Sequence, residues 1–356
     1  MRKSIGFWLI FLVCLGIGID SFGQMNRRSI KRNNKRISSY RGKKFGFSKE
    51  KKYNSIGISL SAFNYYGDLS PLPSRLSTDI SFTRPALGIS WAHRFGPRYT
   101  VQASFMYGTL KGDDASSADP NKDEAVYRYV RNLSFRNRIK ELTVVAMFDL
   151  FENQSTYISR VKWTPFAFAG VTAFHHNPQA QAPATDLNGQ PLAEAGDWVD
   201  LQPLGTEGQY ADLGPDAVNS DIKPYHKLQV AIPFGIGARI RLNEVMDFSV
   251  EFAVRYLFTD YIDDVSKNYV DLNTLDSELA KAMSYRSNEV NSTNENVTAI
   301  TSNRDISYGG YTVVNGYGAE YPDNLRGNRN NKDFYTVTTF RLTYIVGKTF
   351  HRAKFR

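Results

Sequence analysis

The chain has 356 residues, of which 42% are hydrophobic and 13% aromatic, with a single cysteine and a formal net charge of +9. This length allows one large β domain or two smaller ones, and one cysteine excludes an intrachain disulfide. The charge is not a nucleic-acid signature, because residues 25–53 carry a net charge of +11 whereas residues 54–356 carry −3.

Residues 1–23 have the pattern of a secretory signal peptide. Basic residues precede an apolar run that ends at Ile19, and small residues come just before a predicted cleavage site at Gln24. The run is short for an uncleaved membrane helix. Cys14 follows the bulky Val13, which argues against a lipoprotein signal, so we expect the only cysteine to leave with the signal peptide.

Residues 24–53 form a basic leader that lacks the apolar periodicity of a folded segment. We expect it to be disordered in the periplasm. An exported leader does not meet nucleic acid, so lipid phosphates, cell-wall carboxylates or an acidic protein surface are the expected partners. A solvated leader without a specific partner is the alternative. The basic residues that we expect to contact a partner are Arg27, Arg28, Lys31, Arg32, Lys35, Arg36, Arg41, Lys43 and Lys44.

The remaining residues, 54–350, alternate between apolar and polar side chains. In MDFSVEFAVRYLF, residues 246–258, the even positions from Met246 to Phe258 are apolar, which predicts a β-strand with one apolar face. Eight segments read as strands, although the faces of 163–174 cannot be assigned. They are residues 56–62, 87–92, 99–107, 141–150, 163–174, 228–242, 246–258 and 339–350.

Long and short connections alternate between these strands, which is typical of an up-and-down barrel. We therefore predict an all-β fold, an eight-stranded antiparallel transmembrane β-barrel of the outer-membrane type. Its long loops are expected outside the cell, and its short turns, both termini and the C-terminal tail 351–356 in the periplasm. The long loops are residues 67–85, 112–131, 177–224 and 262–332.

The apolar faces could point to lipid, or to the core of a soluble lipocalin-like barrel. Lipid is favoured by the small polar face of the first strand, which suits a narrow lumen, and by aromatic residues near the strand ends. These aromatic residues are Tyr99, Tyr107, Tyr256, Phe258, Tyr344 and Phe350. The charged residues expected to pair inside the lumen are Glu251, Arg255, Arg239, Arg241 and Arg341.

The longest connection contains one helical pattern. Leu272, Leu275, Leu279 and Met283 follow helical spacing, so residues 272–285 are predicted to form an amphipathic helix over the barrel mouth. Residues 286–332 are rich in Asn, Ser, Gly and Tyr and are predicted to form a loop.

Short strings of residues at the strand ends and in the loops carry a family resemblance. They are Tyr65–Leu69 (YYGDL), Phe174–Pro178 (FHHNP), Leu204–Gln209 (LGTEGQ), Ala231–Gly237 (AIPFGIG) and Phe258–Ser266 (FTDYIDDVS). Together they resemble the DUF6089 family of PorG-like outer-membrane components of the type IX secretion system, over about residues 54–350.

The resemblance implies a small barrel that associates with the periplasmic ring of that secretion system, made of a lipoprotein and its partner. It assigns no catalytic residue. The basic leader and the very long fourth loop depart from the PorG pattern, which leaves open whether the chain is the secretion component or a relative with another task.

Candidate sites for chemistry are sparse. His175 and His176 form the only histidine pair and are best read as structural residues at the rim. Asp260, Asp263 and Asp264, with Asp113 and Asp114, are weak calcium candidates, because they lack the spacing of a calcium-binding loop. Glu251 and Arg255 are expected to form an ion pair with each other in the lumen.

No Ser, His and acid set stands out by its spacing, so we expect neither an enzyme nor a cofactor. An eight-stranded barrel is just wide enough to be filled by side chains, which excludes passage of a folded protein. We expect a scaffold for secretion, with outer-membrane lipid and the periplasmic ring proteins as partners. The alternatives are a stand-alone surface barrel whose loops bind ligand or matrix and, far behind, a rim enzyme that uses the histidine pair.

Overall fold

The structure is a computed structural model that describes residues 51–69, 83–123, 125–306, 310–329 and 332–346. These residues belong to one compact unit, Lys49–Arg356. Several predicted features lie outside the described residues. They are the signal peptide, the leader as far as Glu50, the aromatic residue Phe350 and the tail 351–356.

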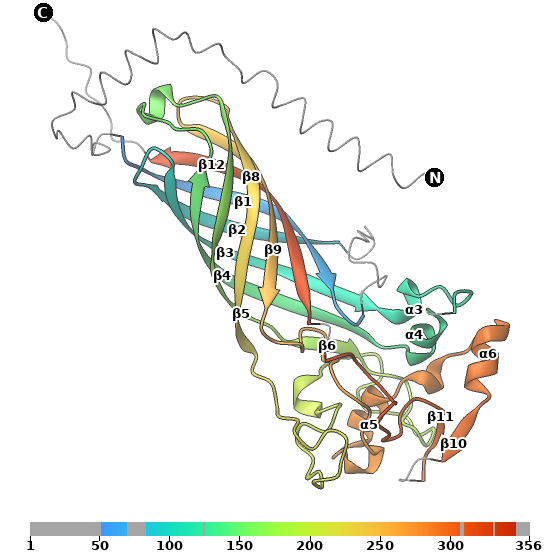
Figure 1. Ribbon diagram of the computed structural model, residues 1–356. Helices are drawn as coiled ribbons and strands as arrows, with labels where there is room; N and C mark the ends of the chain where they lie inside the picture. Colours follow the sequence, from blue (N-terminus) through green and yellow to red (C-terminus); the bar gives the residue numbers. More distant parts are fainter. Residues whose placement is uncertain (1–50, 70–82, 124, 307–309, 330–331, 347–356) are drawn as a thin grey trace, which may run out of the picture. The chain divides into compact units, whose positions relative to one another are not determined.

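Eight long antiparallel strands form a closed barrel (Figure 1). Each pairs with its neighbour along the chain, and β12 returns to pair with β1, so that Ile58 lies between Ile89 and Leu342. The predicted fold class is confirmed, and so are all eight predicted strands, the last of them as far as Val346. The strands are β1 (Tyr53–Tyr66), β2 (Arg84–Arg94), β3 (Tyr99–Asp113), β4 (Ser134–Asp149), β5 (Trp163–His175), β8 (Leu228–Arg241), β9 (Met246–Leu257) and β12 (Phe334–Val346).

The period-two pattern places apolar side chains on the outside of the barrel. Ile58 and Leu87 are 65% and 69% exposed, while Ser59, the residue after Ile58 in β1, is 6% exposed. The direction predicted for the apolar faces is therefore confirmed. The structure also assigns the faces of β5: Val171 points outward and Phe166 inward.

The short connections lie at one end of the barrel and the long ones at the other. The short turns are residues 95–98, 150–162, which contain η2 (Tyr157–Ser159), and 242–245. Asn54 pairs with Val346, so β1 begins and β12 ends at the short-turn end. Figure 1 shows the remaining elements gathered beyond the opposite end.

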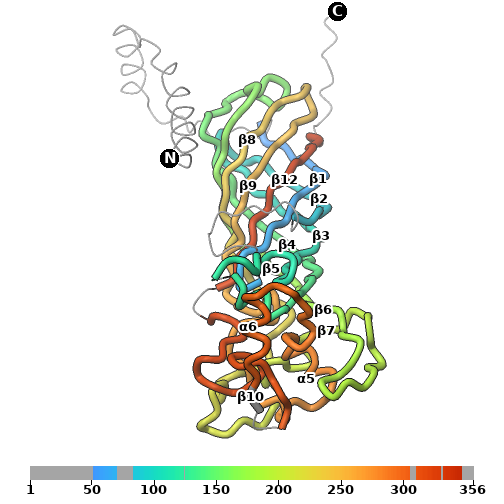
Figure 2. Tube along the Cα trace, turned by 90° about the vertical axis from the view of Figure 1, so that its right-hand side faces the viewer, coloured from blue at the N-terminus to red at the C-terminus, as the bar shows by residue number. Residues whose placement is uncertain are grey.

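Three of the four long connections fold into a second structure, which we call the cap: the described parts of residues 114–133, 176–227 and 258–333. Figures 1 and 2 show it beyond the same end of the barrel. It has its own core, in which Val130, Tyr269, Tyr285 and Val314 are buried together. Its elements are α3 (Asp114–Ser117), α4 (Val126–Arg131), β6 (Pro178–Gln181), β7 (Trp198–Asp200), η3 (Gln202–Leu204), η4 (Leu272–Thr274), α5 (Glu278–Ser284), η5 (Ser287–Glu289), α6 (Glu295–Thr301), β10 (Arg304–Ile306) and β11 (Thr312–Val314).

Two predictions for the longest connection are wrong. The helix expected over 272–285 is interrupted: Ser277 caps α5 by accepting a hydrogen bond from the backbone N–H of Ala280, so the helix begins only at Glu278. Residues 286–332 are not an irregular loop, because they contain η5, α6, β10 and β11. The side chain of Asn294 caps α6, a signal that was present in the sequence.

Candidate functional site: ion pairs of the lumen and a carboxylate cluster beneath the cap

Charged side chains pair across strands in the barrel interior. Arg341 donates to Glu251 through Nε at 3.0 Å and Nη2 at 2.9 Å, and Arg255 Nη2 donates to Glu141 Oε1 at 2.8 Å. The predicted pair between Glu251 and Arg255 is wrong. Residues four apart along a strand are separated by about 13 Å, which is too far for a direct pair. Glu251 pairs instead with Arg341 of the neighbouring strand β12. Arg255 reaches across the lumen to Glu141 of β4, which is not a neighbour of β9.

Further guanidinium groups occupy the short-turn half of the lumen. Asp149 Oδ2 is contacted by Arg94 Nη1 at 2.6 Å and by Arg239 Nη1 at 3.3 Å. Arg241 Nη1 donates to the carbonyl of Arg160 at 2.9 Å. Sequence reasoning missed Arg94, because period two indicates the inward face but only strand register decides which charges meet. It missed Arg160 because this residue lies in a turn, where no strand pattern marks an inward face.

Apolar side chains fill space between the ion pairs. Met147, Phe166 and Phe168 pack together inside the barrel, and Phe63 and Tyr335 lie in a second buried group nearer the cap. A lumen filled in this way leaves no path for a polypeptide.

Carboxylates gather where the barrel opens into the cap. We call this set the junction cluster: Asp68, Glu207, Asp260, Asp263, Asp264 and Asp333. β1 and β9 both pair with β12, so the segments after β1, after β9 and before β12 meet at one rim. Asp68 follows β1, Asp260 to Asp264 follow β9 and Asp333 precedes β12, while Glu207 comes from the cap.

Tyr65 joins two members of the junction cluster. Its hydroxyl lies 2.6 Å from Asp263 Oδ2 and 3.0 Å from Asp333 Oδ1. One hydroxyl hydrogen cannot serve two carboxylates. If Tyr65 donates to Asp263, the shorter contact, then a protonated Asp333 carboxyl satisfies the other contact by donating to the phenol oxygen. The backbone N–H groups of Val265 and Ile262 donate to the remaining oxygens of Asp263 and Asp333, at 3.0 and 3.1 Å.

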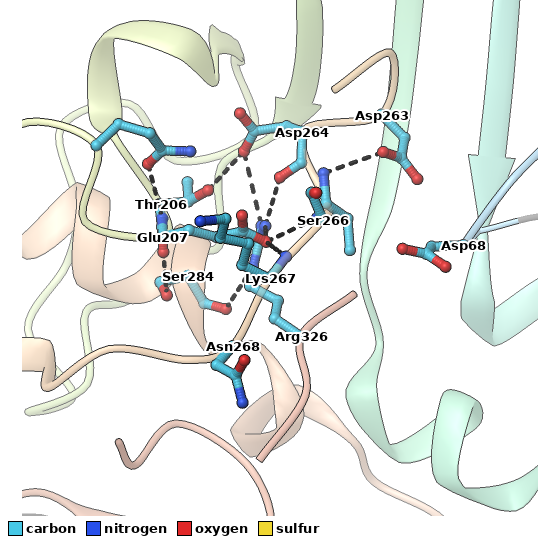
Figure 3. Close-up of polar contacts among 12 residues, drawn as sticks. Asp68, Thr206, Glu207, Asp263, Asp264, Ser266, Lys267, Asn268, Ser284 and Arg326 are labelled. Carbon is cyan, nitrogen blue, oxygen red and sulfur yellow. Dashed lines mark hydrogen bonds and ion pairs between the residues drawn. The ribbon is translucent and has the colours of Figure 1, made fainter. Parts of the chain in front are cut away.

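Glu207 and Arg326 form the centre of the cluster (Figure 3). Glu207 Oε1 accepts from Ser266 N at 2.9 Å, Lys267 N at 3.1 Å and Arg326 Nη1 at 3.1 Å. Arg326 Nη1 also donates to the carbonyl of Asp264 at 2.5 Å. Arg326 is 2% exposed and Glu207 fully buried, so this contact fastens two cap segments together out of reach of water.

Asp264 links its segment to two further side chains of the cap. It adopts a left-handed φ of 69°, unusual for a non-glycine residue. Thr206 Oγ1 donates to its Oδ2 at 2.6 Å and the Tyr225 hydroxyl donates to its Oδ1 at 2.7 Å. These contacts hold the strained backbone in place, because they fix the side chain on both sides.

Burial shifts the pKa values of the cluster. It raises the pKa of Asp260 to about 7 and that of Asp264 to about 6, the latter against the opposing effect of Arg326. The pKa values of Asp263 and Asp333 lie well above the ordinary value, through burial and through the charges of neighbouring aspartates. Asp260, Asp263 and Asp333 therefore keep their protons to higher pH than ordinary aspartates do.

Asp113 and Asp114 do not join the cluster, although Asp114 is connected to it. Asp113 caps α3 by accepting from Ser116 N at 3.0 Å. Arg131 donates to Asp114 Oδ2 at 2.8 Å, and also to the carbonyls of Asp68 and Arg326, both at 2.8 Å. Arg131 thus ties the helical segment of the cap to the junction.

The two histidines differ. His175 is exposed, whereas His176 is buried, with its Nε2 3.1 Å from the carbonyl of His226. Burial lowers the pKa of His176 to about 4, so its ring is neutral near pH 7.

Within the described ranges, no group of three or more His, Cys, Asp or Glu residues is arranged to hold a metal ion. Asp260, Asp263 and Asp264, the weak calcium candidates, instead engage protein donors, as for Ser266 Oγ and Asp260 Oδ2 at 2.7 Å. None of the helices in the part of the chain that the structure describes has the length and apolar character needed to cross a membrane.

Four of the five strings that carry the family resemblance meet around the junction. Tyr65–Leu69 supplies Tyr65 and Asp68, Leu204–Gln209 supplies Glu207, and Phe258–Ser266 supplies the three aspartates after β9. Phe174–Pro178 supplies His176, which stacks on Tyr225 at 5.8 Å between ring centroids. The sequence singled out these strings, but their convergence is visible only in the structure.

The strand pairing defines a closed eight-stranded, up-and-down antiparallel β-barrel whose long connections form a folded cap. Residues 45–189 match the family model described as "Domain of unknown function (DUF6089)". A search of curated proteins gives no match.

Solved structures with a similar arrangement include outer-membrane barrels. The attachment invasion locus protein Ail of Yersinia pestis, solved with the heparin analogue sucrose octasulfate, is 6% identical (TM-score 0.33, covering 83% of this chain and 99% of that chain). Neisserial surface protein A is 7% identical (TM-score 0.34, 82% and 96%). A major outer membrane protein of Thermus thermophilus is 9% identical (TM-score 0.35, 82% and 99%).

Proposed function

We propose that the protein is a non-enzymatic outer-membrane barrel that acts as a scaffold in a type IX protein secretion complex. The observation that carries this proposal is a barrel that is apolar outside and filled inside. A filled barrel cannot pass a polypeptide, so its contribution to secretion is to hold other components at the membrane.

The outer surface fits a bilayer. Large apolar side chains are exposed around the wall, including Ile58, Ile89 and Ile236. Aromatic side chains gather near the short turns: Phe151 and Trp163 lie edge to face with centroids 5.1 Å apart, as expected for an interfacial girdle.

Orientation follows from the general plan of outer-membrane barrels, which have their long loops outside the cell. The cap then faces the exterior. Tyr53 begins β1 at the short-turn end, so the basic leader enters the periplasm there. Its positive charge suits an acidic surface on the lipoprotein ring and its partner.

A charge on the outer wall is expected to impair insertion. Changing Ile89, which is 63% exposed, to arginine should reduce folding stability in lipid vesicles by about 2–4 kcal/mol, because a guanidinium near the bilayer midplane loses its hydration. Urea titration of vesicle-reconstituted protein measures this change. The exposed turn residue Glu152 changed to arginine is the control; equal effects of both changes would contradict a lipid-facing wall.

The scaffold role is tested through the leader. A photoreactive crosslinker placed at Lys35 or Lys43 is expected to capture periplasmic ring proteins in cells that secrete through the system. Changing Arg27, Arg28 and Lys31 to glutamate reverses the charge at these positions. This change should abolish capture and secretion while leaving the barrel in the membrane. Capture of lipid alone, with normal secretion by the reversed variant, would refute the proposal.

The folded cap favours a second candidate function, a surface barrel whose cap binds a ligand or matrix component. A separate hydrophobic core gives the cap a fixed surface on which a ligand could dock. Tyr127, 58% exposed on the cap, is a suitable probe. Loss of surface adhesion in Tyr127→Ser cells with intact secretion would favour this function over the scaffold.

A further inference from the structure

A small polar cavity lies inside the barrel in its short-turn half. Its volume is about 30 Å³, and Arg94, Thr100, Arg239 and Arg341 are among the residues that line it. A polar cavity needs about 10–15 Å³ to hold one water molecule, so this one has room for a small ion. The four residues come from β2, β3, β8 and β12, so strands from opposite sides of the barrel line it.

Three polar groups in the cavity wall lack partners. Arg94 Nε, Thr100 Oγ1 and Arg341 Nη1 are buried and have no hydrogen-bond acceptor or donor among the described residues. Guanidinium nitrogens can only donate, and a threonine hydroxyl can donate. The cavity therefore offers up to three hydrogen-bond donors with nothing to accept them.

The same region carries excess positive charge. Asp247 and Glu251 also line the cavity, but Arg160 binds Asp247 Oδ1 at 2.5 Å and Arg341 binds Glu251 Oε2 at 2.9 Å. Guanidinium groups outnumber carboxylates by two in this half of the lumen. Arg239 and Arg241 are half-buried and partly hydrated, and the uncompensated charge of the buried groups is costly. The groups are Arg94, Arg160, Arg239, Arg241 and Arg341 against Asp149, Asp247 and Glu251.

We propose that this cavity binds a small monovalent anion of the size of chloride or bromide. An anion accepts hydrogen bonds from all three unpartnered groups and offsets part of the excess charge. A single water molecule accepts only two hydrogen bonds, so it would leave one of the three donors without a partner. The Arg239 side chain, which lines the cavity, is 17% exposed.

The first test uses bromide as the probe. Crystals of the full mature chain in detergent, grown in sodium bromide, are expected to give an anomalous peak between Arg94, Thr100 and Arg341. Thermal unfolding should also occur at a higher temperature in bromide or chloride than in gluconate at equal ionic strength, because gluconate is too large to enter. No peak in the lumen, together with equal unfolding temperatures, would overturn the proposal.

A matched pair of variants separates the ion from general packing. Thr100→Val removes a hydroxyl that has no partner among the described residues, so we expect unchanged unfolding in gluconate and about tenfold weaker bromide dependence. Ser59→Ala removes another unpartnered buried hydroxyl that does not line the cavity, and should leave the bromide dependence intact. Equal bromide dependence in Thr100→Val and the unchanged protein would refute the site.

Discussion

Replacing Arg326 with alanine is expected to release the cap while leaving the barrel folded. Arg326 is the guanidinium between Glu207 and Asp264, with Nη1 3.1 Å from Glu207 Oε1 and Nη2 3.7 Å from Asp264 Oδ2. Its removal leaves two buried carboxylates facing each other. Breaking a buried pair in this way costs about 3–5 kcal/mol, which is a large share of the stability of a small domain.

Hydrogen exchange resolved by segment measures this effect. Amides of α5 and of residues 264–268 should lose protection in Arg326→Ala, while those of β4 and β9 keep it. Arg329→Ala is the matched control, because Arg329 is exposed. Unchanged protection of the cap would show that the junction cluster does not hold it, and loss in barrel and cap together would show that they unfold as one unit.

Raising the pH from 6.5 to 9 is expected to loosen the cap. Undocking exposes carboxyls whose folded pKa values lie above the ordinary 3.8, to about 7 for Asp260 and well above 3.8 for Asp263 and Asp333. The docked cap therefore binds more protons, and its stability falls with rising pH by about 1.4 kcal/mol per unit for each proton released. Protease sensitivity of the cap across this range measures the change.

The lower limit of this pH range, 6.5, is chosen because of His176. Its folded pKa of about 4 lies below the ordinary 6.5, so its effect on stability has the opposite sign between pH 4 and 6.5. Above 6.5 this opposing effect ends, and the carboxyls decide the direction. A cap that becomes more stable between pH 6.5 and 9 would contradict proton retention at the junction.

Two neutral variants test where the proton resides. In Asp333→Asn, the amide nitrogen can donate to the Tyr65 oxygen while the amide oxygen accepts from Ile262 N, so the cap should stay docked at pH 9. Asp263 accepts on both oxygens, from Tyr65 and from Val265 N. Asp263→Asn places an amide against a donor and should weaken docking at every pH. The reverse order of the two variants would assign the proton to Asp263.

The barrel could be predicted from the sequence because its strands are two-sided. Alternation in segments such as Met246 to Phe258 gives the strands and the outward face without knowledge of their partners. The inward and outward faces of β5 could not be assigned from the sequence, since Ala167, Ala169 and Gly170 are too small to mark a face. The fold of the long loops was missed because α6 and β11 are short and depend on contacts from distant segments.

The candidate site, like the fold, could be predicted from the sequence only in part. Inward charges such as Glu251 and Arg341 could be named in advance, but register, which pairs Thr339 with Glu251 and Ser59 with Arg341, decided which charges meet. The junction cluster depends on tertiary structure alone. Tyr65, Glu207 and Asp263 are far apart in the chain. Barrel closure brings the segments after β1 and β9 to one rim, and the cap places Glu207 against them. Burial there raises the pKa values of Asp263 and Asp333. By itself, the sequence determined a two-sided wall of eight strands, because a period of two is a local property.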